Sequence, residues 1–273
     1  MSVKPSINHW TFPAEWPLER CFRVAKDAGF QGFEVNLGES GALAPSSTEQ
    51  EVREVAEQAR RIGIELSSLS TNLFGRNPLT SPDPGVREKG AALGRKMLQV
   101  AGWLGVDAVL VVPGVVTAEV PYDDAYHRAQ ESLKTLVKDA EAAQICMCVE
   151  NVWNKFLLSP LEMCRFVDEI GSPWVQCYFD VGNVLVFSFP QHWIRILGTR
   201  IKRIHVKDFK TQIGNIRGFT NLLEGDVDWL EVVSALREVG YDSFVTAELS
   251  GFRLYPERLI EETARTLDVI LAS

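Results

Sequence analysis

Four side chains of the kind that bind divalent cations stand where successive apolar segments of the chain become polar. Glu150 follows CMCV, Asp180 follows QCYF, His205 lies within RIHVKD, and Glu248 follows VTA. Three carboxylates brought together repel one another, and removing each from water costs several kcal/mol unless a cation compensates. Three oxygen ligands with one imidazole suit Mn²⁺ first, and also Mg²⁺, Co²⁺ or Zn²⁺. We therefore predict that these four residues hold one divalent metal ion.

Each of these residues, taken alone, has a simpler interpretation. A carboxylate at the end of a strand more often caps a helix or forms a salt bridge, and a single histidine is usually a core or surface residue. The placement of all four at the ends of successive apolar segments favours the metal site.

The elements that must position these residues follow a repeating pattern of amphipathic helix, glycine and short apolar strand. In the first unit Leu18, Cys21, Phe22 and Ala25 mark the inner face of a helix that Gly29 ends. Spacings of three and four are helical, and glycine suits the left-handed residue that follows a helix. The strands are nearly continuous apolar runs, as expected when both faces of a sheet are covered.

Eight strands alternate with eight helices along the chain. The strands are expected near residues 5–9, 32–37, 64–70, 107–112, 145–150, 174–179, 201–206 and 244–248. The helices are expected near residues 17–28, 48–62, 84–104, 124–143, 160–170, 190–198, 227–239 and 256–271. This pattern predicts a single α/β domain, a (β/α)₈ barrel over residues 1–273, with a doubly wound open sheet as the alternative. In such barrels the active site lies at the carboxyl ends of the strands.

Composition excludes several classes of protein. A net charge of −8 argues against a nucleic-acid partner. The sequence predicts no membrane partner, because no run approaches the roughly 18 apolar residues that span a bilayer and the first residues lack the pattern of a signal peptide. The five cysteines lack the paired spacing of a zinc ribbon and fit buried thiols in a reducing compartment. We expect a soluble cytoplasmic protein.

Several segments of the chain resemble the xylose-isomerase-like superfamily of sugar isomerases and epimerases. Those closest to its L-ribulose or L-xylulose 5-phosphate 3-epimerase branch are PWVQCYFDVGN, IHVKDFK, LEGDVDW, and LSTNLFGRNPLTSPD with the helix that follows it. The chain departs from that branch in three places. It has NLLEG where relatives have Pro-Phe-Gly-Glu-Gly, Asn183 where some have histidine, and the unusual loop TQIGNIRGFT.

This resemblance implies a metal-dependent sugar or sugar-phosphate epimerase that inverts C3 of a ketose. Glu150, Asp180, His205 and Glu248 would be the ligands, and Glu150 and Glu248 the two catalytic acid/base groups. The metal would stabilise an enediolate while one carboxylate removes the α-proton and the other returns it from the opposite face. The resemblance also implies a homodimer or homotetramer and a small-molecule sugar or sugar phosphate as the partner.

Further side chains near the strand ends are candidates for binding the substrate. They are His9, Asn72, Arg76, Trp153, Asn183, Lys207 and Arg217. Arg76 and Arg217, with other loop cations, are candidates for a phosphate. Lys207 and Asp208 could steady His205 or form a surface ion pair.

Other activities on the same barrel remain open. A keto-inositol dehydratase or a hydroxypyruvate-type isomerase would use the same ligands. An apurinic endonuclease is less favoured, because its three-zinc cluster needs more histidines than the four in this chain. A non-catalytic sugar-binding barrel would not need two opposed carboxylates.

Overall fold

Eight parallel strands close into a barrel in the computed structural model, which describes residues 3–273. The strand order around the barrel is β1-β10-β7-β6-β5-β4-β3-β2. These strands are β1 (Lys4–Asn8), β2 (Gly32–Asn36), β3 (Glu65–Ser70), β4 (Ala108–Val111), β5 (Cys146–Glu150), β6 (Val175–Asp180), β7 (Ile201–Val206) and β10 (Phe244–Ala247). The predicted (β/α)₈ barrel is confirmed, and the open-sheet alternative is wrong because β1 pairs with β10.

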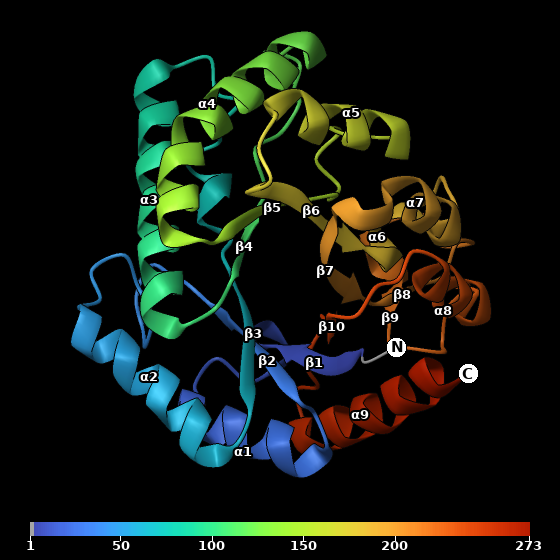
Figure 1. Ribbon diagram of the computed structural model, residues 1–273. Coiled ribbons are helices and arrows are strands. Elements are labelled where there is room, and N and C mark those ends of the chain that lie inside the picture. The colour runs from blue at the N-terminus through green and yellow to red at the C-terminus, as the bar shows by residue number, and fades with distance from the viewer. Residues whose placement is uncertain (1–2) are drawn as a thin grey trace.

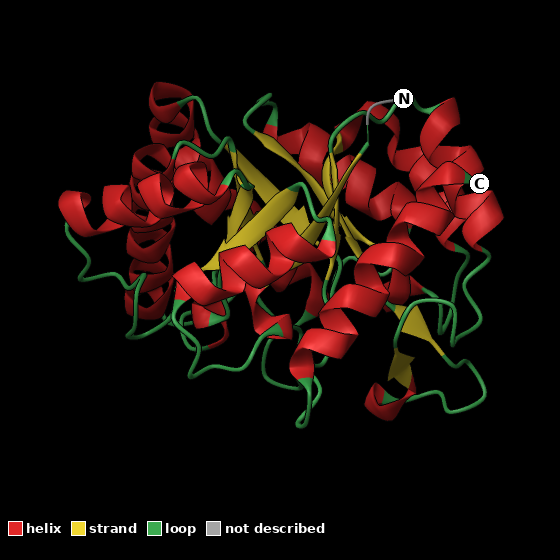
Figure 2. Cartoon of the chain, turned by 90° about the horizontal axis from the view of Figure 1, so that it is seen from below, coloured by secondary structure: helices red, strands yellow, loops and turns green. Residues whose placement is uncertain are grey.

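Helices surround the barrel on the outside, as Figures 1 and 2 show. They are α1 (Leu18–Ala28), α2 (Glu49–Ile62), α3 (Pro84–Leu104), α4 (Tyr122–Ala143), α5 (Pro160–Ile170), α6 (Val181–Val184), α7 (Pro190–Leu197), α8 (Trp229–Glu238) and α9 (Pro256–Ala272). Within residues 3–273, none of the helices combines the length and apolarity that crossing a membrane requires.

Capping residues mark the ends of several helices. Gly29, Gly63 and Gly105 follow α1, α2 and α3 with positive φ angles, and their amides bond to carbonyls of the last turn. Thr48 begins α2 with a capping box, and Ser159 accepts the amide of Glu162 at the start of α5. Local sequence therefore fixes these ends of α1, α2, α3 and α5.

Residues along the strands alternate between the helices outside and the interior of the barrel. On β7, Ile204 and Val206 belong to the main apolar core, whereas Arg203 and His205, which alternate with them along the strand, are buried polar residues. The same alternation places Glu34 of β2 inside with 0% exposure. Because successive side chains of a strand point to opposite faces, these polar residues share the barrel interior.

Two short features were not expected from the sequence. Helix α6 begins directly after Asp180, and its Gly182 lies against Lys207, where a Cβ atom would come within 2.7 Å of the Lys207 carbonyl. Strands β8 (Asp208–Phe209) and β9 (Phe219–Thr220) form an antiparallel pair that follows β7. Both features lie at the carboxyl end of the barrel and shape the candidate site.

Candidate metal centre

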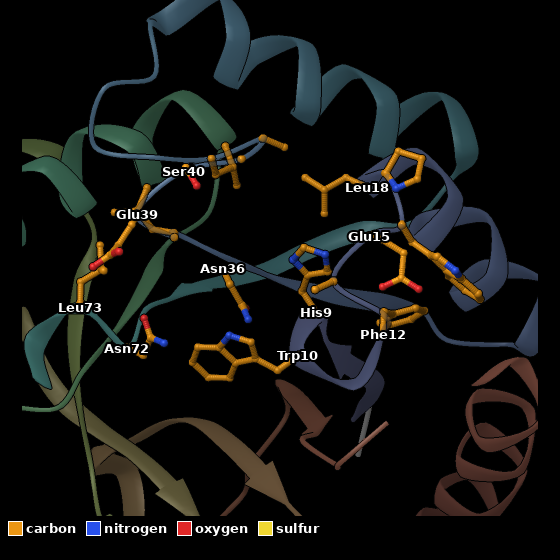
Figure 3. Close-up of a pocket in the computed structure, with 18 of the residues that line it drawn as sticks. His9, Trp10, Phe12, Glu15, Leu18, Asn36, Glu39, Ser40, Asn72 and Leu73 are labelled. Atoms are coloured by element: carbon orange, nitrogen blue, oxygen red, sulfur yellow. The ribbon is translucent and has the colours of Figure 1, made fainter. Parts of the chain in front are cut away.

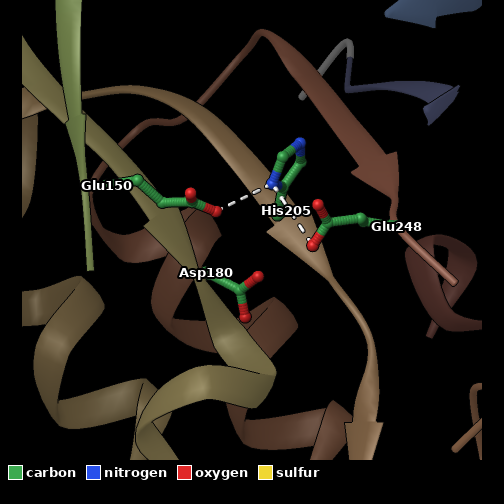
Figure 4. Close-up of side chains that lie close together, drawn as sticks. All are labelled: Glu150, Asp180, His205 and Glu248. Atoms are coloured by element: carbon green, nitrogen blue, oxygen red, sulfur yellow. Dashed lines mark hydrogen bonds and ion pairs between the residues drawn. The ribbon is translucent and has the colours of Figure 1, made fainter. Parts of the chain in front are cut away.

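Glu150, Asp180, His205 and Glu248 converge at the carboxyl ends of four neighbouring strands (Figure 4). Each offers one ligand atom, and these four atoms all lie within 4.8 Å of one another. His205 Nδ1 is 3.0 Å from Glu150 Oε1 and 3.8 Å from Glu248 Oε2. Asp180 and His205 are fully buried, Glu150 is 6% exposed, and the Glu248 side chain is 20% exposed.

Strand register explains why residues so far apart in sequence meet. Asp180 pairs with His205 across β6 and β7, and Thr246 of β10 pairs with His205 on its other side. Glu248 lies two residues beyond Thr246, so both side chains point into the barrel. Asp180 also caps α6, since its Oδ1 accepts the amide of Asn183 at 2.8 Å. Asp180 therefore also caps a helix, which is the simpler role expected of a carboxylate at the end of a strand.

The ring of His205 is held by a buried carboxylate on the opposite side of the barrel. Its Nε2 donates to Glu34 Oε1 at 2.7 Å, and the other Glu34 oxygen accepts from Ser68 and Tyr178, each at 2.6 Å. Asn8 also donates to Glu34. This arrangement leaves Nδ1 facing Glu150 and Glu248. The two-residue alternation along β2 and β7 is the sequence signal that both side chains point inward.

Lys207 lies among the same carboxylates. Its Nζ is 2.5 Å from Asp180 Oδ2 and also contacts Glu248. With Glu34 included, four carboxylates face one ammonium and one imidazole, so two negative charges remain uncompensated when all four carboxylates are ionised and His205 is protonated. A divalent cation would supply that missing charge, and the oxygen-rich donor set fits a hard or borderline ion.

The surroundings of Glu150 and Glu248 shift the pKa values of these two glutamates in opposite directions. Burial raises the pKa of Glu150 to about 7. Burial acts in the same direction on Glu248, but the charges of Lys207 and His205 outweigh it and hold the pKa of Glu248 at about 2. Burial opposes protonation of His205, yet the carboxylates of Glu34 and Glu248 raise its pKa well above the usual value.

A cavity of about 640 Å³ opens beside these side chains, and we call it the proximal cavity. Glu150, Glu248, Trp153, Asn183 and Lys207 line it together with Trp10 and the Phe219–Asn221 segment. Trp153 is held in place because its indole donates to the carbonyl of Asn183 at 2.7 Å. Three of the seven predicted substrate-binding residues therefore lie beside the candidate metal ligands.

The other four predicted substrate-binding residues lie elsewhere. His9, Asn72 and Arg76 line a second cavity, of about 700 Å³, next to the ends of β1, β2 and β3. Arg76 pairs there with Glu39. Arg217 is exposed on the loop between β8 and β9 and lines neither cavity. The sequence pattern predicted one end of the barrel for all seven residues and did not separate the two cavities.

Asp208 neither steadies His205 nor forms a surface ion pair, the two roles that the sequence suggested. It is fully buried and accepts from the amides of Leu223 and Val227 and from the indole of Trp229, at 3.0–3.1 Å. Asp208 is therefore not a surface ion pair. It holds the segment that carries Asn221 against the end of β7.

Comparisons with known proteins agree with this architecture. The sequence profile described as "Xylose isomerase-like TIM barrel" matches residues 22–270. The chain is 28% identical over 230 residues to L-ribulose-5-phosphate 3-epimerase UlaE of Salmonella paratyphi A, covering 82% of this chain and 78% of that protein. It also superposes on a structure of L-ribulose 3-epimerase with a TM-score of 0.84 at 18% identity, covering 99% and 95% of the two chains. D-psicose 3-epimerase from Clostridium cellulolyticum H10 gives 0.83 at 18% identity, covering 98% and 99%.

Proposed function

Because the chain belongs to the xylose isomerase-like TIM barrel family, we propose that this enzyme is a divalent-metal-dependent ketose 3-epimerase. The observation that carries the proposal is the position of Glu150 and Glu248. They flank His205 Nδ1 from two different strands and line the same cavity. Two carboxylates on either side of one substrate carbon are what a two-base inversion requires.

The residues divide the work of the proposed reaction. Glu150, Asp180, His205 and Glu248 would hold the cation, which when bound supplies Lewis-acid stabilisation of the negative charge that develops on the ketose oxygens. One of Glu150 and Glu248 takes the proton from C3 as the carbon loses its configuration. The other returns a proton from the opposite face, so the product is the C3 epimer and no redox partner is needed.

Neighbouring side chains would orient the sugar. The Trp153 ring lies 5.4 Å from that of Phe209 and 4.9 Å from that of Phe219, measured between ring centroids. Trp153 and Phe219, with Phe209 buried behind them, give the proximal cavity an apolar side, and Asn183 adds a polar one. The donor set favours Mn²⁺ as the native ion. The free cysteines suit a reducing compartment, and we propose the cytoplasm.

The decisive experiment follows the C3 proton. The Mn²⁺-loaded protein is incubated in D₂O with D-fructose, L-ribulose and L-ribulose 5-phosphate, and C3 deuteration and the epimer formed are measured by NMR. Glu150→Gln and Glu248→Gln are each expected to lower the rate at least about 100-fold, because each removes one acid/base group. Glu65→Gln, an exposed change at the opposite end of β3, is the matched control with unchanged rate.

The products separate the proposal from its alternatives. Transfer of a proton from C1 to C2 with formation of an aldose would indicate an isomerase instead, and loss of one water molecule from a keto-inositol would indicate a dehydratase. The absence of C3 deuteration with all three ketoses, in a protein shown to contain Mn²⁺, would refute ketose 3-epimerisation.

A further inference from the structure

The cavity lined by His9, Asn36 and Asn72, which we call the distal cavity, adjoins the proximal cavity. Both open at the carboxyl end of the barrel, and both include Trp10 in their walls. Figure 3 shows the Trp10 ring beside the side chains of Asn36 and Asn72, below His9. With the Asn36 amide oriented to satisfy both its atoms, its oxygen accepts from Trp10 Nε1 at 2.7 Å. This hydrogen bond fixes the Trp10 ring, which forms the wall that the two cavities share.

The distal cavity presents polar side chains that have capacity for a ligand. Among residues 3–273, neither the His9 ring nor the Asn72 amide makes a side-chain hydrogen bond. Burial lowers the pKa of His9 to about 4, so its ring is neutral near pH 7 and can both donate and accept. The Asn72 amide likewise offers one acceptor and two donors. This mixed set matches hydroxyl groups, which also donate and accept.

The charges of the distal cavity do not suit an anion. Its lining contains one arginine, Arg76, which is already paired with Glu39, and a further carboxylate, Glu15. A phosphate placed there would meet no unpaired cation and one uncompensated acid. Trp10 is 40% exposed and adds a flat apolar surface of the kind that packs against a sugar ring.

We propose that the distal cavity binds a neutral glycosyl group, so that the natural substrate is a ketose that carries a second sugar ring. This inference rests on the proposed function for the ketose half, which occupies the proximal cavity. Trp10 then lies between the two rings. Each cavity has the size of a typical small-molecule site, and a lone monosaccharide would leave the distal one without a role.

The test compares three probes on the Mn²⁺-loaded protein by calorimetric titration: D-fructose, isomaltulose (D-fructose with a glucosyl group on O6) and D-fructose 6-phosphate. We expect isomaltulose to bind at least about tenfold more tightly than either of the others. His9→Ala and Asn72→Ala should each reduce the preference for isomaltulose over D-fructose by about three- to tenfold, the effect of losing one hydrogen bond. Gln31→Ala, an exposed amide at the opposite end of β2, should leave that preference unchanged.

Two results would overturn the proposal. One is equal affinity for isomaltulose and D-fructose. The other is a preference for D-fructose 6-phosphate that Arg76→Gln abolishes, which would make the distal cavity a phosphate site. Failure of the proposed function looks different: isomaltulose would still bind with sensitivity to Asn72→Ala, but none of the ketoses would exchange its C3 proton.

Discussion

Among single side chains, Glu34 most directly decides how His205 can act. A histidine presents one ring nitrogen to a cation only when the other nitrogen carries the proton. Because Glu34 Oε1 accepts from Nε2 at 2.7 Å, Nδ1 is the nitrogen left to face Glu150 and Glu248. Burial opposes ionisation of Glu34, but the adjacent His205 and the hydrogen bonds from Ser68 and Tyr178 keep its pKa below the usual value.

Replacing Glu34 should weaken metal binding without touching a ligand. We expect Glu34→Gln to raise the dissociation constant for Mn²⁺ by about 10- to 100-fold, because the amide no longer fixes the orientation and proton of His205. Calorimetric titration of the metal-free protein measures this constant, with Glu65→Gln as the matched control at the other end of the barrel. If Glu34→Gln leaves the dissociation constant for Mn²⁺ unchanged, His205 does not need the Glu34 carboxylate in order to bind the cation.

Lys207 competes with the proposed cation for the same carboxylates. Removal of its ammonium leaves Asp180 and Glu248 uncompensated, which destabilises the metal-free protein and makes the site more attractive to a cation. We expect Lys207→Gln to lower the Tm of the metal-free protein and to increase the rise in Tm that Mn²⁺ produces. Thermal unfolding with and without Mn²⁺ measures both. A smaller rise than in the wild type would mean that Lys207 assists the cation instead.

At the level of chain segments, Asp208 organises the turn between β9 and α8. Its carboxylate accepts two amides and one indole from residues 223–229, so that segment depends on one side chain. We expect Asp208→Ala to lower the free energy of unfolding by about 2–3 kcal/mol, because buried donors lose their acceptor. Hydrogen exchange of the Leu223 and Val227 amides should accelerate first. Protection of those amides equal to that of the wild type would contradict this role.

Most helices and strands could be predicted because their signals are local. The glycine after each helix and the apolar spacing predicted α2, α3 and α5 to within one residue. Helix α6 was missed because four residues carry no periodicity, and the β8–β9 pair was missed because two-residue strands have no pattern. The candidate ligands were found because strand ends of a barrel meet at one rim. The division into two cavities depends on Trp10 and on loop packing, which no local pattern encodes.

In the molecule as a whole, the carboxyl ends of the strands hold the candidate metal ligands. The opposite end of the barrel holds a group of contacts around Arg203, which we call the clamp. Arg203 is 4% exposed and donates to the Ser67 carbonyl at 2.9 Å and to Ser243 Oγ at 2.8 Å, and it also contacts Asp107. It thereby joins β3, β7 and the segments before β4 and β10. These contacts therefore stabilise the barrel at the end away from the candidate metal ligands.

The clamp predicts a dependence of stability on pH. Burial opposes ionisation of Asp107, but Arg203 and Lys202 outweigh it and lower the Asp107 pKa. A lowered folded-state pKa gives stabilisation that is present above the unfolded value of about 3.9 and is lost as the pH falls below it. We expect Asp107→Asn to lower the free energy of unfolding by about 1 kcal/mol at most at pH 7, since half of that side chain is exposed, and by progressively less as the pH falls below about 3.9. Urea unfolding across this range measures the difference, and a constant difference would contradict the pairing.

The binding of one cation by four strand ends is tested most directly by anomalous diffraction from a crystal grown with Mn²⁺. We predict one strong peak roughly 2.0–2.3 Å from Glu150, Asp180, Glu248 and the Nδ1 atom of His205. A peak at any other place, or Lys207 still bridging Asp180 and Glu248 with no peak between the four side chains at saturating Mn²⁺, would contradict it.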